Sequence, residues 1–189
     1  VTTDSLFERK YTSLFPRMYV NYDFNKKHSL KFTYGRRIER PNYRDLNPFL
    51  WFLDSLTFRQ GNPYLLPQFA HNFELSHTFK QQWITTLNYS ITDNVISELL
   101  KQNTEKRITF LTVENVARFR NIGLSITAPI KPASWWNMNV FVNVFNNQFE
   151  GQYYNSFTGK NDPIDIDYTS YLLNVTNSFT FKKGWSAEI

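Results

Sequence analysis

Apolar and polar side chains alternate along most of this chain, with the period of two that is typical of a β-strand having one face in each environment. In residues 83–92, Trp83, Leu87 and Ile91 fall on one parity, whereas Asn88 and Ser90 fall on the other. The same alternation occupies residues 14–24, 30–35, 69–79, 121–130, 136–145 and 170–181, and a further strand is expected to begin at Trp185. The pattern predicts about eight antiparallel strands and no helix longer than about three turns.

The connections between these strands fall into two classes. Short polar segments lie at residues 25–27, 80–82, 131–134 and 182–184, and long ones are expected at 40–66, 97–107 and 150–166. Short and long connections alternate along the chain, so each kind gathers at one edge of the sheet. This arrangement predicts an up-and-down meander.

Strand length and the chemistry of the polar face separate two classes of all-β protein. The predicted strands span about 10 to 15 residues, longer than the five or six usual in soluble domains. Their polar parity carries Asn, Ser, Thr and Gly rather than Lys and Glu. Outer-membrane barrels combine such strands with short periplasmic turns, long extracellular loops and an apolar outer face. The predicted fold is therefore all-β, an antiparallel meander forming part of a larger outer-membrane β-barrel; a soluble β-sandwich is the alternative.

Aromatic residues flank the short turns on the apolar parity, where a membrane barrel carries an interfacial girdle. The predicted girdle comprises Phe24, Phe79, Trp83, Trp136, Phe181 and Trp185. Two polar residues, Arg36 and Asn177, also fall on this parity and fit it poorly. We expect either that Gly35 marks a bulge that switches the parity at Arg36, or that this strand sits lower than its neighbours.

Composition narrows the possible functions. Aromatic residues make up 18% of the chain and there is no cysteine, which excludes disulfides and thiolate metal sites. The longest apolar run, Phe49 to Leu53, is far below the roughly 18 residues of a membrane-spanning helix. The first ten residues lack the pattern of a signal peptide. The net charge of +5 comes from scattered lysines and arginines, so nucleic acid is not an expected partner.

Two motifs resemble those of a known family. Residues 36–49 read RRIERPNYRDLNPF and residues 61–68 read GNPYLLPQ. They resemble the signature of the TonB-dependent-receptor-like outer-membrane β-barrel family, which is abundant in Bacteroidetes. Arg40, Pro41, Tyr43, Leu46, Asn47, Pro48 and Phe49 match its first part, and Gly61, Asn62, Pro63, Leu65 and Pro67 match its second. Glu74 would be the family's strand glutamate, whereas Gln68 stands where the family usually has Glu.

The resemblance implies a barrel of roughly 22 strands with an N-terminal plug, energised through TonB for uptake of scarce nutrients in the outer membrane. Residues 1–189 would then be one partial barrel domain without the plug, a piece of a longer chain. Its implied partners are outer-membrane lipid, the remainder of its own barrel and plug, TonB indirectly through the plug, and an unidentified small or oligomeric nutrient.

No catalytic arrangement stands out in the sequence, so we expect neither an enzyme nor a cofactor. The histidines are widely spaced, and His71 and His77 would lie about 20 Å apart on one strand. Asp162, Asp165 and Asp167 are a weak Ca²⁺ candidate, against which we favour an ordinary solvated acidic loop. The candidate ligand contacts are aromatic residues of the long loops, Tyr43, Trp51, Tyr64, Tyr153 and Tyr154. Packing within the loop is the favoured alternative for the first three.

Three functions remain open at this stage. The first is the wall of an outer-membrane TonB-dependent transporter or receptor, with a polar lumen face that includes Asn88, Asn121, Asn137, Asn139, Asn143, Asn174 and Thr176. The second is a non-transporting barrel or a subunit of an outer-membrane complex. The third is a soluble secreted carbohydrate-binding sandwich, in which exposed aromatic rings would stack on sugars.

Overall fold

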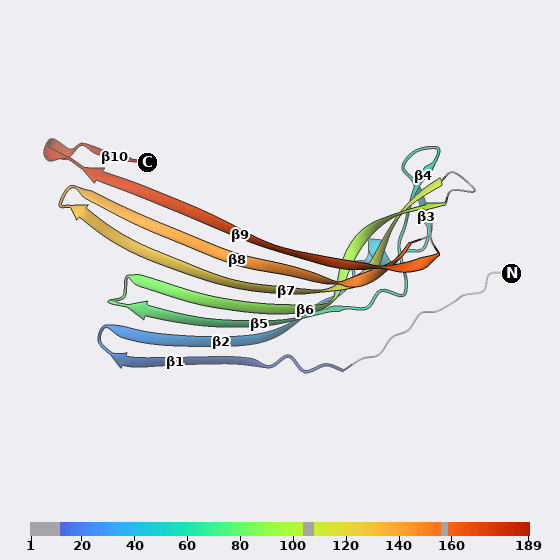
Figure 1. Ribbon diagram of the computed structural model, residues 1–189, viewed down its shortest axis with the longest axis horizontal. Helices are drawn as coiled ribbons and strands as arrows, with labels where there is room; N and C mark the ends of the chain where they lie inside the picture. The colour runs from blue at the N-terminus through green and yellow to red at the C-terminus, as the bar shows by residue number, and fades with distance from the viewer. Residues whose placement is uncertain (1–11, 104–107, 156–158) are drawn as a thin grey trace.

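Eight strands follow one another in chain order across a single curved sheet (Figure 1). The computed structural model describes residues 12–103, 108–155 and 159–189. The strands are β1 (Arg17–Asn25), β2 (His28–Glu39), β5 (Gln68–Phe79), β6 (Trp83–Asn103), β7 (Ile108–Ala133), β8 (Trp136–Asn155), β9 (Lys160–Thr180) and β10 (Ser186–Glu188). Each pairs antiparallel with the next, which confirms the predicted meander. The sheet is open, with β1 and β10 at its edges, as part of a larger barrel would be.

The predicted short turns gather at one end of the sheet, as expected from the sequence, and the long β2–β5 connection lies at the other end. The β5–β6 turn has positive φ at Lys80 (50°) and Gln81 (56°), the backbone that favours tight two-residue hairpins. A short 3₁₀ turn, η1 (Lys182–Gly184), joins β9 to β10. At the opposite end, the β2–β5 connection contains α1 (Tyr43–Leu46), β3 (Leu50–Phe52) and β4 (Thr57–Gln60).

In the described part of the chain, no helix is long and apolar enough to cross a membrane.

Two of the three predicted long loops are wrong in most of their length. Residues 97–103 continue β6, residues 150–155 continue β8, and residues 160–166 begin β9. These strands reach 20 to 26 residues, well beyond the 9–11 that cross a bilayer. Ladder pairing continues to Asn103↔Ile108 and Asn155↔Lys160. The alternation is lost there because both faces of a strand outside the bilayer can be polar, while the backbone ladder still holds it.

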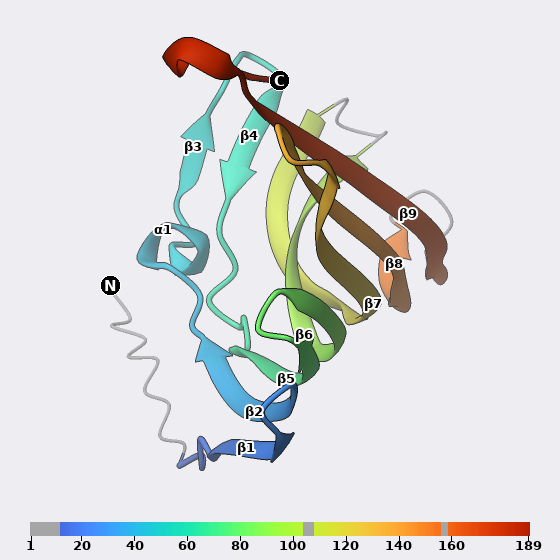
Figure 2. The same cartoon turned by 90° about the vertical axis from the view of Figure 1, so that its left-hand side faces the viewer.

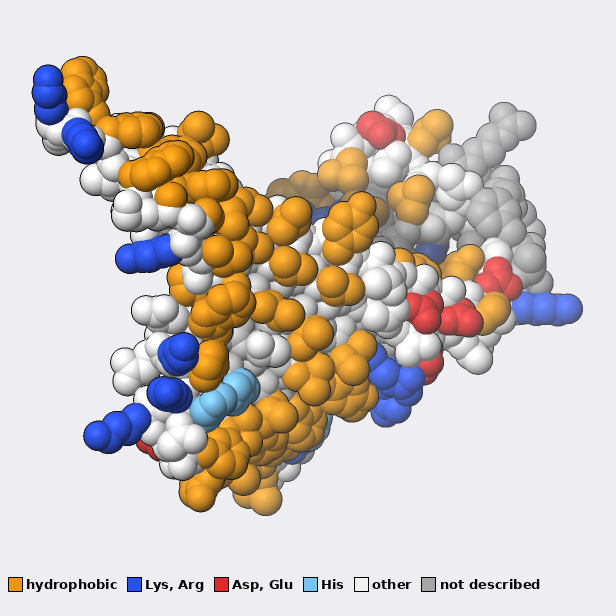
Figure 3. Space-filling view, turned by 60° about the vertical axis from the view of Figure 1, so that its left-hand side comes forward, with side chains coloured by type: hydrophobic (Ala, Val, Ile, Leu, Met, Phe, Trp, Pro, Cys, Tyr) orange, Lys and Arg blue, Asp and Glu red, His pale blue; other side chains and the backbone are white. Residues whose placement is uncertain are grey.

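The register gathers the apolar parity on one face. One row across the sheet consists of residues paired strand to strand, namely Phe32, Leu75, Leu87, Leu124, Val144 and Tyr171. Figure 3 shows the hydrophobic side chains spread over this convex face. In the described ranges only four hydrophobic residues are buried, namely Leu65, Val113, Val116 and Ala128. A soluble sandwich would cover its apolar face with a second sheet, and the described part of this chain forms a single sheet.

The expected bulge at Gly35 is wrong. The β2–β5 register runs without interruption from His28↔Phe79 to Glu39↔Gln68. Arg36 therefore does lie on the apolar face, where Nη1 donates to the Leu14 carbonyl at 2.9 Å. Its guanidinium carbon lies 4.7 Å from the centroid of the Phe69 ring. Its row continues through His71, Ile91, Arg120, Gln148 and Asp167, so Arg36 lies where the apolar face gives way to polar side chains.

Asn177, the second poor fit, has partners that explain it. The indole N–H of Trp136 donates to Asn177 Oδ1 at 3.0 Å. The Asn177 backbone exchanges two hydrogen bonds with Ile189, of 2.7 and 2.9 Å. A polar side chain at this position satisfies the one donor of a tryptophan ring that otherwise faces an apolar environment.

Candidate functional site

The first long loop folds into a compact structure around α1. The Asn42 side chain caps this helix by accepting a hydrogen bond from the Asp45 N–H at 2.9 Å. After the loop has turned through β3 and β4, the Gly61 N–H donates to the Asn47 carbonyl at 2.9 Å. A Cβ atom at Gly61 would overlap that carbonyl and lie 2.6 Å from the Asp45 carbonyl oxygen. The glycine of the motif is thus required for close approach of two backbone segments.

Two asparagines fasten this loop to the extensions of β6 and β7. Asn62 Nδ2 donates to the Val113 carbonyl at 3.2 Å. Asn115 accepts from the Leu66 N–H at 2.7 Å and donates to the carbonyls of Leu66 and Asn94 at 2.9 and 2.7 Å. Leu65 is 3% exposed beneath them. These residues of the second motif therefore form a structural anchor.

The β3–β4 hairpin is also attached to β7. Thr57, Phe58 and Arg59 pair in parallel with Thr109, Phe110 and Leu111 of β7. The Phe58 ring lies between those of Phe52 and Phe110, with centroid distances of 5.1 and 5.7 Å. Arg59 forms ion pairs with Glu98 at 2.8 Å and Asp45 at 3.4 Å. The parallel contact joins the loop to a strand about 50 residues further along the chain.

At the tip of this hairpin, Asp54 closes the turn. The Leu56 N–H donates to Asp54 Oδ1 at 2.8 Å, and the Thr57 N–H donates to the same oxygen at 2.9 Å. The bond from Leu56, together with those from Thr57, lowers the pKa of this exposed carboxyl. A charged Asp54 is therefore part of the folded turn.

The folded loop surrounds a hollow of 490 Å³, which we call the loop hollow. Its lining consists of Tyr43, Arg44, Asn47, Phe49, Trp51, Leu53, Arg59 and Gly61. Tyr43, Phe49 and Trp51 are 82%, 78% and 71% exposed. Viewed along the strands, α1, β3 and β4 lie on the concave side of the sheet (Figure 2). Exposed aromatic rings beside a guanidinium can stack on a planar or ring-shaped ligand and pair with its negative charge.

The structure brings together two of the five predicted ligand-contact aromatics. Tyr43 and Trp51 line the loop hollow, whereas Tyr64 is exposed on the same loop outside its lining. Tyr153 and Tyr154 lie on β8, where the Tyr154 ring centroid is 5.9 Å from Lys101 Nζ. Sequence reasoning missed Arg44 and Arg59 as part of the hollow. The apolar run at residues 49–53 was the sequence feature that pointed to this hollow, because Phe49, Trp51 and Leu53 belong to its lining.

The acidic candidate lies along β9 rather than in a loop. Asp162 accepts a hydrogen bond from Asn155, and Asp167 accepts one from Asn146. Within the described ranges, no three His, Cys, Asp or Glu side chains gather as a metal site.

The concave face carries a chain of side-chain amides across four strands. Asn88 donates to Asn121 at 2.7 Å, Asn121 donates to Asn147 at 2.7 Å, and Asn147 donates to the Tyr168 hydroxyl at 3.0 Å. Gly123 leaves room for this chain, because a Cβ there would lie 2.6 Å from Asn88 Oδ1. Two of the predicted lumen residues, Asn88 and Asn121, are thus directly joined.

A second hollow, of 540 Å³, opens nearby over β1, β2, β5 and β6. Its polar lining includes Arg17, Arg37, Asn72, Glu74, Asn88 and Ser90. Gly35 contributes to this hollow with nothing within 4 Å of the place a Cβ would occupy. The concave face is therefore polar and incompletely filled, as expected for a lumen wall.

An apolar convex face, a polar concave face, tight turns at one end and a folded loop at the other define the wall of an outer-membrane β-barrel. The chain matches the sequence profile of the Outer membrane protein beta-barrel family over residues 1–189. It belongs to that family, and it is an outer-membrane protein resembling the barrels of TonB-dependent receptors.

Two solved structures with a similar fold are those of siderophore receptors. The siderophore receptor PirA from Pseudomonas aeruginosa aligns with a TM-score of 0.56 and 17% identity, over 92% of this chain and 37% of that one. A mutant of the ferric enterobactin receptor PfeA from Pseudomonas aeruginosa, in complex with enterobactin, aligns with a TM-score of 0.54 and 15% identity, over 92% and 34%. The chain thus spans about a third of the length of these receptors. No curated protein matches its sequence.

Proposed function

We propose that this chain is a wall segment of an outer-membrane, TonB-dependent transporter or receptor for nutrient uptake. One observation carries the proposal: the first long loop is anchored over the concave side of the wall and presents exposed aromatic rings there. A scaffold barrel has no need of such a surface at its mouth. Loops held on a rigid frame commonly carry recognition.

In this proposal the roles divide between the loop and the wall. Tyr43 and Trp51 stack on the nutrient, and Arg44, which has no hydrogen bond or ion pair within the described residues, supplies a positive charge. The amide-rich concave face then lines the path inward. Tyr64, Tyr153 and Tyr154 are further candidate contacts in the same outer region.

The rest of the machinery is also part of the proposal. Residues 1–189 form one partial barrel domain, and a plug that reaches TonB is supplied by the remainder of the same protein. The protein transports its ligand without chemical change. The ligand is a small or oligomeric nutrient too scarce or too large for general porins.

The test uses a bacterial strain in which the gene for the full-length barrel is deleted. The gene is then restored as wild type, as Tyr43→Ala/Trp51→Ala, or as the control Tyr171→Ala, which removes an exposed tyrosine from the apolar face, away from the loop. Each strain is grown on a panel of iron, carbon and cofactor sources, with and without functional TonB. We expect a growth defect on one source in the deletion and TonB-deficient strains, a large defect in the double variant and little in the control.

Two controls define the outcome. A heat-modifiable electrophoretic band must show that every variant is a folded barrel. If the deletion strain grows as well as wild type on every source, the barrel is not a nutrient transporter, and a non-transporting barrel or complex subunit becomes the better account.

A further inference from the structure

Lysines are concentrated at the short-turn end of the sheet. The four short turns and their immediate flanks contain Lys26, Lys27, Lys80, Lys131, Lys182 and Lys183. We call this set the lysine rim. Figure 3 shows basic side chains along this end, at the left-hand edge of the apolar convex face. Close to them in sequence, the only carboxylate side chains are those of Asp23 and Glu188, so this end is strongly positive.

Two of the turns are fastened to each other. The Lys80 N–H donates to the Lys27 carbonyl at 2.6 Å, so the β1–β2 and β5–β6 turns lie side by side. Asn25 Oδ1 accepts from the N–H groups of Lys27 and His28 at 2.8 and 3.1 Å, which fixes the first turn. Lys80 Nζ lies 5.2 Å from the centroid of the Phe79 ring. The ammonium group is thus held at the level of the aromatic girdle.

A histidine pair lies at the same level, and the spacing of residues along the sequence does not reveal it. His28 Nδ1 and His77 Nε2 are 3.1 Å apart, because β2 and β5 bring the two residues diagonally together on the apolar parity. A hollow of 310 Å³ opens beside the turn, lined in part by Lys26, Lys27 and His28. The polar groups here therefore cluster at one height, immediately beneath the hydrocarbon-facing surface.

The other half of the lysine rim combines a cation with open apolar surface. Ser134, Trp135, Thr180, Phe181 and Lys182 line a hollow of 460 Å³. Trp135 and Phe181 are 46% and 49% exposed, and their ring centroids are 6.1 Å apart. An acyl-glycerol group fits the chemistry of such rings, and a phosphate fits the adjacent ammonium.

We propose that the lysine rim binds the phosphate groups of anionic glycerophospholipids in the leaflet at the short-turn side of the membrane. Basic groups just outside the hydrocarbon attract anionic headgroups, and aromatic rings fix the depth at which they sit. A nucleic acid or an acidic protein would also meet positive charge, but neither explains cations placed in contact with a membrane-facing apolar surface. The proposal needs only the barrel in a membrane, so its failure would leave the proposed transport untouched.

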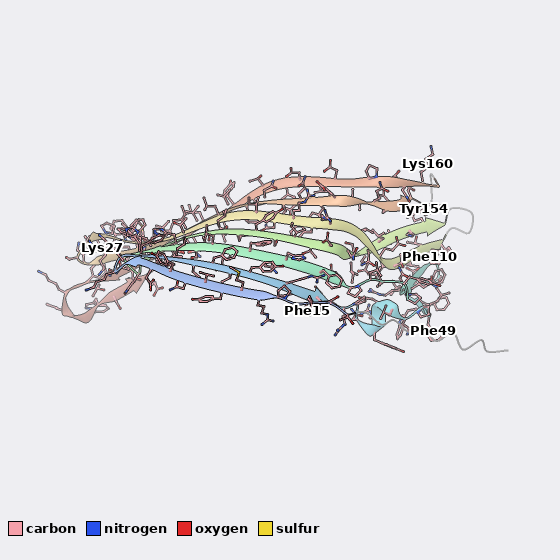
Figure 4. The ribbon with its side chains drawn as sticks, turned by 90° about the horizontal axis from the view of Figure 1, so that it is seen from below. Phe15, Lys27, Phe49, Phe110, Tyr154 and Lys160 are labelled. Carbon is pink, nitrogen blue, oxygen red and sulfur yellow. The ribbon has the colours of Figure 1, made fainter. Side chains whose placement is uncertain are left out.

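The test uses the full-length barrel in nanodiscs of phosphatidylcholine containing a minor fraction of phosphatidylglycerol. Native mass spectrometry after release counts the retained lipids. The variants are Lys27→Gln/Lys80→Gln and Lys182→Gln/Lys183→Gln, and the matched control is Lys160→Gln at the opposite end of the sheet (Figure 4). Glutamine keeps the chain length and removes the charge.

We expect the wild type to retain phosphatidylglycerol over phosphatidylcholine by about tenfold after correction for abundance, and each double variant to lose most of that preference. High salt should weaken the preference, and Lys160→Gln should keep it. Equal retention of the two lipids by wild type would overturn the proposal, as would equal losses in Lys160→Gln and the double variants. In a second set of nanodiscs that also contain lipopolysaccharide, selective retention of lipopolysaccharide over phosphatidylglycerol would overturn it as well. Should a double variant fail to fold, Lys80→Gln alone gives the same comparison.

Discussion

The two ends of this sheet are held by different kinds of contact. At the short-turn end the turns are closed by local bonds, as when Asn25 accepts from N–H groups two and three residues away, and the Lys80 N–H additionally joins two neighbouring turns by donating to the Lys27 carbonyl. At the long-loop end the bonds join distant parts of the chain, as when Asn62 reaches Val113 and Arg59 reaches Glu98. A local turn forms with its hairpin, whereas the folded loop requires β6 and β7 to be in place first. The long-loop end should therefore respond more to single substitutions.

The comparison depends on an apolar band that separates the ends, and charge placed in that band should have the largest effect. Leu173→Arg or Val140→Arg should cost about 2–4 kcal/mol of folding free energy in the full-length barrel, because the charge meets hydrocarbon. Asn174→Arg and Asn139→Arg, on the opposite parity, should cost much less. Folding titrations in lipid bilayers measure both, and equal costs would show that the two faces have been exchanged.

The next largest difference in stability is expected between two glycine-to-alanine substitutions, one in the folded loop and one in strand β2. Gly61→Ala places a methyl group against backbone carbonyls of Asn47 and Asp45, and should destabilise the folded loop by about 2 kcal/mol. Gly35→Ala, whose Cβ meets nothing within 4 Å, should change stability little. Hydrogen exchange of the amides in residues 43–66 measures the opening of the loop. Unchanged protection in Gly61→Ala would mean that the close backbone approach does not hold the loop.

Replacing one asparagine by alanine at each end of the sheet compares the stability of the two ends directly. Asn115→Ala removes three hydrogen bonds and leaves the Leu66 backbone unpaired, so it should cost about 1–3 kcal/mol. Asn25→Ala removes two bonds to exposed N–H groups that water can replace, and should cost about 0.5–1 kcal/mol. Denaturant titration of each variant, with hydrogen exchange to locate the opening, gives the two values. A larger cost at Asn25 would reverse the proposed order of the ends.

The smallest expected effect is a local response to acid at the tip of the β3–β4 hairpin. The folded turn lowers the pKa of Asp54 below its ordinary value of 3.8. Its contribution to stability is therefore present above that value and is lost as the pH falls through the lowered pKa. Amide exchange at Leu56 and Thr57, corrected for intrinsic rates, should rise below about pH 4. Asp54→Asn keeps an acceptor oxygen but cannot titrate, so its exchange should not show this rise.

The contrast between the ends also explains what could be predicted from the sequence. Alternation located the membrane-crossing parts of β2, β5, β6, β7, β8 and β9, because a strand between lipid and a polar lumen must alternate. It missed the outer extensions of four strands, where no such difference in environment exists. It also missed β3 and β4, which are three and four residues long and exist because they pair with each other and with β7.

Site prediction met the same limit. Residue type marked Tyr43 and Trp51 as candidates in the outer loop, but packing within the loop was the favoured interpretation, and their exposures of 82% and 71% do not fit it. Neither the pairing of His28 with His77 nor the joining of Asn88 to Asn121 could be found without strand register. Asn177 seemed misplaced for a related reason, since its partner, Trp136, lies on the neighbouring strand.

In the proposed transporter, the chain of amides from Asn88 to Tyr168 would affect how strongly the wall holds a passing solute. Each asparagine in it already donates to its neighbour, so part of the hydrogen-bonding capacity of the lining is satisfied within the lining itself. A solute must compete with these bonds as well as with water to be retained. Such a lining remains hydrated but binds a solute only weakly, so the solute would diffuse onward and would not be retained. Weak binding of this kind requires amides close enough to hydrogen-bond to one another. Gly123 leaves the space that the Asn88 side chain needs to do so.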